Sequence, residues 1–500
     1  MHFDIMKYGA VPDGKALSTQ AIAEAIDACS KAGGGTVIVP PGTFLSGPIE
    51  LRSNMVLHVA AGAMILFHHD IATHPLVESR WAGTELHMYS PLVFGKDLEN
   101  VAVTGRGVFD GNPQVWWDYF NACNKAGDRE PICDRGRELA GLNKGRYEDT
   151  DCGGSGLRSQ CLRPPLMELN NCRNVRLDGF TNQNSPFWNT HLLYCEDVTV
   201  HDVTFRNPIG APNGDGLDLD SCNGVRVSNC HFDVNDDCLC LKSGMNDDGH
   251  RVGKPSENIT ITNCTMLRGH GGVVFGSDGA GGIRNVVVSN CIFNGTDRGI
   301  RLKANRGRYS VYEDLRFDNI IMKNVRCPFV MNLFYTCGST EATHDIISDP
   351  NARPRRASQI DTARPTTIEV AITQIASGVA RTSVGPLTIM RVTERCNNSN
   401  TVMERNPTST NAPNVSNLWW PYGWSSSGPR LANLAIQSAN TLLVASNEEW
   451  TVSAATERAC EDTRAATLSD STPRLIQSTP RSTLPTSTLR GLTFVIVRAP

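Results

Sequence analysis

Six ionisable residues between positions 215 and 303 are of the types that hydrolyse a bond in a charged polymer. They are Asp215, Asp236, Asp237, His270, Arg301 and Lys303. Hydrolysis of a glycosidic bond needs one carboxyl group that donates a proton and another that activates water. Crowded carboxylates repel one another, so the pKa of one of them rises and it keeps its proton near neutral pH. Because Arg and Lys pair with substrate carboxylates, the set indicates hydrolysis of a polymer that contains uronic acid.

Each of these residues also has an ordinary structural explanation when it is taken alone. An Asp-Asp pair such as Asp236-Asp237 is usually a turn, and a single His is more often a structural residue than a catalyst. Arg301 and Lys303 alternate along a predicted strand, as residues on a solvated face do. A catalytic function therefore depends on whether the fold brings the whole set together.

A short strand motif recurs along the chain and predicts that fold. It starts with Asn, Asp or Gly and continues with alternating apolar residues, at Asn100, Asn174, Asp197, Gly224, Asn258, Asn285 and Asp314. From position 174 onward the starts lie 23–34 residues apart. Alternating β-branched residues predict short strands, and their recurrence without helical periodicity predicts the coils of a parallel β-helix. A β-propeller would need about 40–45 residues per repeat.

The candidate residues follow their strand motifs at similar distances. They lie 12–18 residues after each start, on four successive coils. In a β-helix, equal positions on neighbouring coils stack at about 4.8 Å. The pattern therefore predicts three carboxylates, one imidazole and two cations on one face of the solenoid.

Two segments fall outside the repeat. Residues 18–33 have apolar side chains at helical spacing, with Ser18 as a cap and Gly33 as a stop signal. We expect this N-terminal capping helix to cover the open end of the solenoid, which would otherwise expose apolar interior and strand edges. Residues 111–163 predict a long loop insertion that either shapes a binding cleft or is a surface excursion.

The 17 cysteines are not expected to form a disulfide framework, because their number is odd and they are scattered. Six of them flank the repeated strands: Cys172, Cys195, Cys222, Cys230, Cys264 and Cys291. We expect small apolar side chains stacked in the interior, since no paired spacing of a zinc site occurs. Cys238 and Cys240 alternate like strand residues and are expected to join this interior ladder.

Four ordered motifs in the coils resemble those of the polygalacturonases, glycoside hydrolase family 28. They are Asn213-Gly-Asp-Gly-Leu-Asp218, Asn235-Asp-Asp-Cys238, Gly269-His-Gly271 and Arg301-Leu-Lys303, and the similarity covers residues 3–353. The resemblance implies an all-β, right-handed parallel β-helix that hydrolyses galacturonate-containing polysaccharide with inversion. It also implies no metal or other cofactor, and a pectic polysaccharide or oligogalacturonide as the substrate.

The same resemblance assigns a role to each site residue. Asp236 is the general acid, and His270 adjusts it by hydrogen bonding. The remaining roles are activation of water by Asp215 and Asp237, and binding of the substrate by Asn213, Arg301 and Lys303.

The motifs differ from the family pattern at two positions. Gly214 stands where Thr is usual, and Leu302 where Ile is usual. Neither change removes a charge, so activity is expected, with Gly214 altering the packing of a sugar subsite. Two alternatives stay open: a pectate-lyase-like β-elimination, which needs Ca²⁺ ligands and a basic proton abstractor, and a non-catalytic carbohydrate-binding β-helix.

Composition limits the partners and the location. A net charge of −4 without a Lys/Arg stripe argues against nucleic acid, and no apolar run is long enough to span a membrane. The N-terminus shows no secretory signal, which predicts a cytoplasmic protein, or a secreted or periplasmic one if it was trimmed. We expect the catalytic β-helix over residues 1–353. Residues 354–500 lack coils and are expected to be a disordered tail, or one read out of register after a frameshift.

Overall fold

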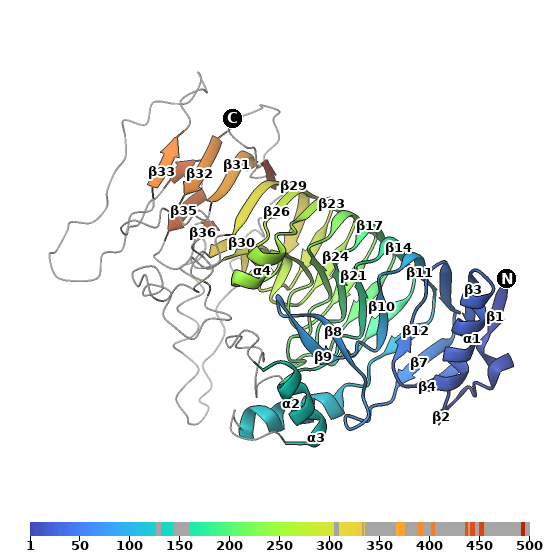
Figure 1. Ribbon diagram of the computed structural model, residues 1–500. Coiled ribbons are helices and arrows are strands. Elements are labelled where there is room, and N and C mark those ends of the chain that lie inside the picture. Colours follow the sequence, from blue (N-terminus) through green and yellow to red (C-terminus); the bar gives the residue numbers. More distant parts are fainter. Residues whose placement is uncertain are drawn as a thin grey trace, which may run out of the picture.

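The computed structural model describes residues 1–126, 132–144, 160–304, 310–332 and 335, together with short strands between residues 367 and 495. Its main body is a solenoid whose coils follow one another from the N-terminus (Figure 1). Within these residues, no helix is long and apolar enough to cross a membrane. The cytoplasmic location expected from the N-terminus stays a prediction.

Parallel pairing of equivalent strands forms the three walls of the solenoid, named here sheets A, B and C. Sheet A contains β1 (His2–Asp4), β3 (Gly35–Val39), β6 (Met55–Val59), β11 (Glu99–Gly105), β14 (Arg173–Asp178), β17 (Glu196–His201), β20 (Asn223–Ser228), β23 (Ser256–Thr262), β26 (Ile283–Ser289) and β29 (Val311–Lys323). Sheet B contains β2 (Asp13–Leu17), β4 (Gly42–Ser46), β7 (Ala63–Phe67), β12 (Val108–Asp110), β15 (Thr181–Gln183), β18 (Thr204–Arg206), β21 (His231–Asp233), β24 (Thr265–Leu267), β27 (Ile292–Asn294) and the end of β29. Sheet C contains β5 (Ile49–Glu50), β10 (Val93–Lys96), β13 (Met167–Asn170), β16 (Thr190–Leu193), β19 (Leu217–Asp220), β22 (Leu239–Lys242), β25 (Gly271–Phe275), β28 (Arg298–Lys303) and β30 (Cys327–Asn332). Equivalent strands of successive coils pair in parallel, so the predicted parallel β-helix is confirmed.

The polar residue that starts each predicted repeat lies near the beginning of a sheet A strand. All seven have a left-handed backbone, with φ between 53° and 72°. Asn, Asp and Gly adopt this conformation at the lowest cost, which explains why the motif starts with them. Asparagine side chains also hydrogen-bond between coils: Asn174 donates to Asn100 over 2.8 Å, and Asn258 donates to Asn223 over 2.8 Å. The repeat therefore encodes both the turn and a polar ladder.

Alternate residues of all three sheets point inward and form one continuous apolar core. The predicted cysteine stacking is confirmed, but as two stacks at different corners. Cys172, Cys195 and Cys222 precede sheet A strands at equal positions, and Cys230, Cys264 and Cys291 precede sheet B strands. All six are buried, and burial raises the pKa of the Cys195 thiol well above its ordinary value. These thiols are small core side chains.

The N-terminal helix forms where it was expected, as α1 (Thr19–Lys31). It buries Ile22, Ile26 and Cys29 in the main core and lies at the N-terminal end of the solenoid in Figure 1. That it covers the open end stays a prediction. Ser18 occupies the N-cap position, but its hydroxyl makes no capping bond and accepts from the Val11 N–H over 3.2 Å. The expectation of a side-chain cap was therefore wrong.

The insertion at residues 111–163 is not only a loop. Its described residues include α2 (Gln114–Ala126) and α3 (Asp134–Leu142), which pack with a hairpin of β8 (Leu76–Trp81) and β9 (Thr84–Tyr89). Together they enclose a second apolar cluster, called here the aromatic lobe: Trp81, Ala82, Leu86, Met88, Tyr89, Trp116, Tyr119, Cys123, Leu139, Cys161, Leu162, Phe187 and Trp188. Since Phe187 and Trp188 belong to a coil, the lobe is attached to the solenoid wall.

Beyond residue 354 the structure describes only backbone strands. They are β31 (Thr367–Ile375), β32 (Thr388–Thr393), β33 (Val402–Arg405), β34 (Ile436–Ser438), β35 (Thr441–Ala445), β36 (Trp450–Ala454) and β37 (Leu492–Val495). β31 pairs with β29 in parallel, and β36 pairs with β30 in antiparallel orientation. The rest of 354–500 lies outside the described residues, so the domain boundary and the expected disorder or frameshift stay predictions.

Candidate active site

The three aspartates and the histidine lie at the corners that lead into sheet C. Leu217, Leu239 and Val273 occupy one register position on β19, β22 and β25. Asp215 and Asp237 therefore hold equal positions on neighbouring coils, and the Gly216 N–H donates to the Asp237 carbonyl over 3.0 Å. Asp236 and His270 are likewise one coil apart, with the His270 N–H donating to the Asp236 carbonyl over 3.1 Å. The predicted gathering of these four residues is confirmed.

Arg301 and Lys303 join the cluster in a different way from the one predicted. Arg301 pairs with Val274, and Arg298 is the residue level with Gly271, so the two cations lie further along sheet C than the acids. Their side chains reach back across β25. Gly271 leaves room for this, because a Cβ there would stand 3.2 Å from the Asp237 carboxylate.

Asp237 is the carboxylate that the cations hold. Its Oδ2 accepts from Lys303 Nζ over 2.7 Å, and its Oδ1 lies 3.7 Å from Arg301. Burial alone would raise the pKa of Asp237, but Lys303 and Arg301 outweigh it and lower the pKa to about 2. Asp237 is thus ionised at any ordinary working pH.

Asp215 has the opposite environment. It is buried, and its pKa is raised well above the ordinary value by burial and then by the Asp236 and Asp218 carboxylates. Asp218, on β19, is buried as well, with a pKa raised to about 7 by burial despite Lys242 at 3.6 Å. Neighbouring carboxyls whose proton affinities differ this much provide an acid and a base in one site.

Asp236 is the most accessible carboxyl of the three. Its side chain is 21% exposed, and its Oδ1 lies 3.1 Å from Nδ1 of the half-exposed His270. The same oxygen accepts from the Asp237 N–H over 2.9 Å. The hydrogen bond with Asp236 raises the pKa of His270. Asp236 is therefore oriented from two sides and faces outward.

Asn213 lies in the turn before Asp215, and its neighbours explain an unusual residue of the motif. Asn213 has a left-handed backbone, with φ of 52°, and its Oδ1 accepts from Arg163 over 2.8 Å. At the next position, a Cβ on Gly214 would stand 2.9 Å from the Ala211 Cβ. This turn is packed too closely for the usual Thr without a shift of Ala211.

Residues outside the predicted set also hold this turn. The Asn207 side chain donates to the Gly214 carbonyl over 3.0 Å and accepts from the Ser185 N–H over 2.8 Å. Asn207 thereby fixes the backbone next to Asp215. Its position at the end of a strand carries no chemical signal in the sequence, so sequence reasoning missed it.

Cys240 was expected in the interior ladder, and this expectation was wrong. Leu239 and Leu241 of β22 face the core, so Cys240 faces outward and its Sγ lies 3.8 Å from Asp237 Oδ2. Ligand atoms of Asp215, Asp237 and Cys240 lie within 4.8 Å of one another. The Lys303 ammonium already neutralises Asp237 there, which disfavours a metal cation.

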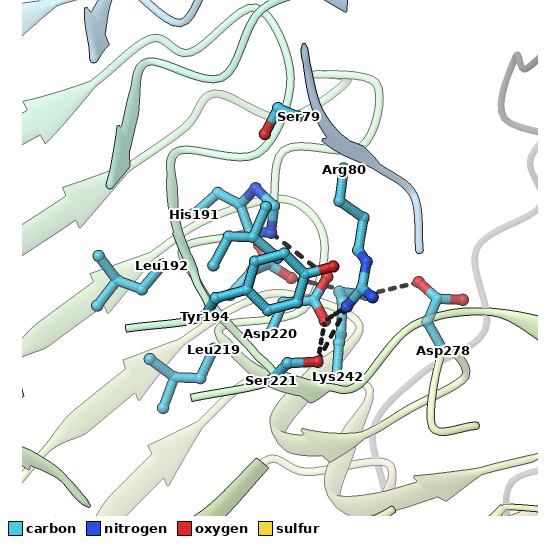
Figure 2. A network of polar contacts seen from close by, with 12 residues as sticks. Ser79, Arg80, His191, Leu192, Tyr194, Leu219, Asp220, Ser221, Lys242 and Asp278 are labelled. Carbon is cyan, nitrogen blue, oxygen red and sulfur yellow. Dashed lines mark hydrogen bonds and ion pairs between the residues drawn. The ribbon is translucent and has the colours of Figure 1, made fainter. Parts of the chain in front are cut away.

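A buried polar network anchors the β8–β9 hairpin to the wall of the solenoid, and Figure 2 shows part of this network. Arg80 donates to Asp220 over 2.8 Å and to the Ser221 hydroxyl over 2.9 Å. His191 contacts Glu168 at 2.9 Å and Asp220 at 3.5 Å. Burial opposes the charge on His191, but Asp220 and Glu168 outweigh it and raise its pKa to about 9. Charges alternate along the network, as buried ions require.

Lys242 lies beside this network and contacts Asp218 at 3.6 Å. It contacts Asp278 at 3.7 Å, an arrangement visible in Figure 2. Its ammonium also lies 4.4 Å from the centre of the Trp188 ring. Lys242 therefore connects the aromatic lobe to the Asp218 and Asp278 carboxylates.

Known proteins match most of the solenoid. Residues 135–348 match the model of the glycosyl hydrolases family 28, and residues 2–120 match a model described as rhamnogalacturonase A/epimerase, pectate lyase-like. The solved exopolygalacturonase of Thermotoga maritima is 34% identical, with a TM-score of 0.58 over 68% of this chain and 77% of that one.

Curated relatives agree with this match. A probable polygalacturonase of Vitis vinifera is 28% identical over 70% of this chain, and an exo-poly-alpha-D-galacturonosidase of Dickeya chrysanthemi is 28% identical over 64%. The chain spans 65% and 55% of the length of these two relatives. By these matches, and with the acid cluster in place, the chain belongs to the glycosyl hydrolases family 28.

Proposed function

We propose that this chain hydrolyses glycosidic bonds in galacturonate-containing polysaccharide, with inversion, as a polygalacturonase. The observation that carries the proposal is the contrast between Asp237, held ionised by Lys303 at 2.7 Å, and Asp215, whose pKa burial raises. Such a contrast leaves Asp237 as an ionised base beside a carboxyl group that keeps its proton and can orient water. Relatives named for polygalacturonase activity support the substrate class.

Asp236 acts as the general acid in this proposal, because it is the most accessible carboxyl and His270 orients it. Asp237 and Asp215 hold and activate the attacking water. Burial favours a proton on Asp215, whereas Lys303 and Arg301 keep Asp237 ionised. Asp237 is therefore the base that deprotonates the water, and Asp215 orients the water by hydrogen bonding.

Arg301 is the main residue that binds the substrate carboxylate in this proposal. Its guanidinium lies 3.7 Å from Asp237, and its side chain is more exposed than that of Lys303. A planar guanidinium binds a carboxylate through two parallel hydrogen bonds. Lys303 adds charge to the same subsite while it holds Asp237.

Substrates with different leaving groups distinguish the residue that acts as general acid from the residues that activate water. Reducing-end release from polygalacturonate is measured for the wild type and for Asp215→Asn, Asp236→Asn and Asp237→Asn. Loss of a general acid lowers the rate about 10²–10⁴-fold. In an aryl galacturonide made from an acidic phenol, however, the leaving group departs as a phenolate and needs no proton. Asp236→Asn should therefore keep most of its activity on the aryl substrate, whereas the other two variants lose activity on both.

The outcomes also test the alternatives. Rescue of Asp215→Asn instead would transfer the acid role to Asp215. A wild-type product with an unsaturated end that disappears with a chelator would indicate β-elimination. Retained oligogalacturonide binding without any reducing-end release would indicate a binding protein.

Attack from the chain end is the favoured mode within this proposal. The relatives from Thermotoga maritima and Dickeya chrysanthemi carry exo-acting names. Product analysis on polygalacturonate should show small products from the first minutes while the viscosity falls slowly. A rapid fall in viscosity with mixed oligomers would show internal cleavage.

A further inference from the structure

Arg163 connects the aromatic lobe to the turn that carries Asp215. Its guanidinium donates to the Pro212 carbonyl over 2.7 Å and to the Asn213 Oδ1 over 2.8 Å. It also donates to the Pro186 carbonyl over 2.8 Å. These acceptors belong to two successive coils, and two of them stand two and three residues before Asp215. One side chain thus holds the turn from outside the solenoid.

The lobe holds Arg163 in return. The guanidinium lies over the Phe120 ring of α2 at 3.9 Å and near the Phe187 ring at 5.2 Å. Its backbone carbonyl accepts from the Trp81 indole over 3.2 Å. Arg163 is fully buried. A buried guanidinium needs several well-placed hydrogen-bond acceptors to offset its lost hydration. The turn therefore fixes the position of Arg163, and Arg163 fixes the position of the turn.

We propose that Arg163 is a positioning residue for hydrolysis, which sets the Asn213–Asp215 turn so that the Asp215 carboxyl faces Asp237. The inference rests on the proposed function, because it assigns Asp215 to the attacking water. By this inference α2 of the insertion contributes to catalysis, because its Phe120 ring packs on Arg163, and the insertion is not only a surface excursion.

The test compares Arg163 with Arg135 of α3 (Asp134–Leu142). Arg135 of α3 donates to the His74 carbonyl over 2.9 Å and pairs with Glu138, and these contacts do not involve the Asp215 turn. A misplacement of about 1 Å costs about 100-fold in rate, so Arg163→Met should lose about that much in kcat on polygalacturonate. Arg163→Lys should lose less, since an ammonium can replace one of the hydrogen bonds. Arg135→Met should stay within about threefold of the wild type.

Two further measurements separate positioning from a general loss of structure. Guanidinium at millimolar concentration should restore part of the kcat of Arg163→Ala, with NaCl at equal ionic strength as control. The double variant Arg163→Met/Asp215→Asn should have the kcat of Asp215→Asn alone, because both changes act through one group.

The inference is overturned if the two losses in kcat multiply, if guanidinium restores nothing, or if Arg135→Met loses as much as Arg163→Met. If Arg163→Met does not fold, Arg163→Lys and the guanidinium rescue decide the question. Wild-type hydrolysis is measured first. Its absence would contradict the proposed function, whereas an active wild type with unaffected Arg163 variants would contradict only this inference.

Discussion

Replacing Lys303 by Met should change the enzyme mainly through Asp237. The ammonium donates to this buried carboxylate over 2.7 Å and is the largest contribution that lowers its pKa from 3.8 to about 2. One pKa unit corresponds to about 1.36 kcal/mol, so the ionised form is stabilised by roughly 2 kcal/mol after the opposing effect of burial is included. Met keeps the length of the side chain and removes the charge. Burial then acts on Asp237 with less opposition, and its pKa rises.

The sign of the stability effect follows from the lowered pKa. The pKa of Asp237 is 3.8 in the unfolded chain and about 2 in the folded protein. Its ionised form therefore stabilises the fold fully above pH 3.8, and this stabilisation is lost as the pH falls through 2. We expect Lys303→Met to lose roughly 2 kcal/mol of unfolding free energy at pH 7 and about half of that at pH 3. The acidic limb of kcat/KM should move up by about 1–2 pH units.

The assay combines denaturant unfolding at the two pH values with pH–rate profiles on polygalacturonate and on a methyl-esterified oligomer. Lys323→Met, at an exposed position at the end of β29, is the matched control. A loss common to both substrates reports Asp237, and an additional loss on the charged substrate reports binding of its carboxylate. An unmoved acidic limb, with equal destabilisation at pH 3 and pH 7, would refute the argument.

Four further predictions follow from the same contacts. Arg301→Met should lose about 2–3 kcal/mol in kcat/KM on charged substrate and much less on the methyl ester; equal losses would contradict a carboxylate contact. Gly214→Thr should lower kcat, because its Cβ meets Ala211 at 2.9 Å, whereas Gly141→Ala, with open space around it, should be neutral in the same assay. Ile261→Ala, in the core, should cost about 2–5 kcal/mol in denaturant unfolding. Chelator should leave the rate unchanged, and a loss restored by Ca²⁺ would indicate a metal-dependent reaction.

The coils were predictable because their signals are local. An alternating strand and a residue that tolerates positive φ occur together in each repeat, as at Asn174 and Asn258. The acid cluster was predictable for the same reason, since Asp215, Asp237 and His270 each lie one or two residues before a sheet C strand. Stacking of the coils then brings these corners together.

Contacts between distant segments were not predictable in this way. Arg80 meets Asp220, and Arg163 meets Asn213, across separate segments of the chain, and no periodic signal marks such pairs. The register of Arg301 and the outward direction of Cys240 depend on where β28 and β22 begin. A shift of one residue in a strand reverses the face of every side chain, so spacing counts alone could not decide them.

The stereochemistry of the first product tests the account most directly. Polygalacturonate is hydrolysed by the wild-type protein in the NMR tube, and the anomeric proton of the new reducing end is followed before mutarotation. Attack by water held between Asp215 and Asp237, with protonation by Asp236, inverts the anomeric centre, so the β-anomer should appear first. Initial release of the α-anomer, or of an unsaturated end, would contradict single-step hydrolysis by this aspartate cluster.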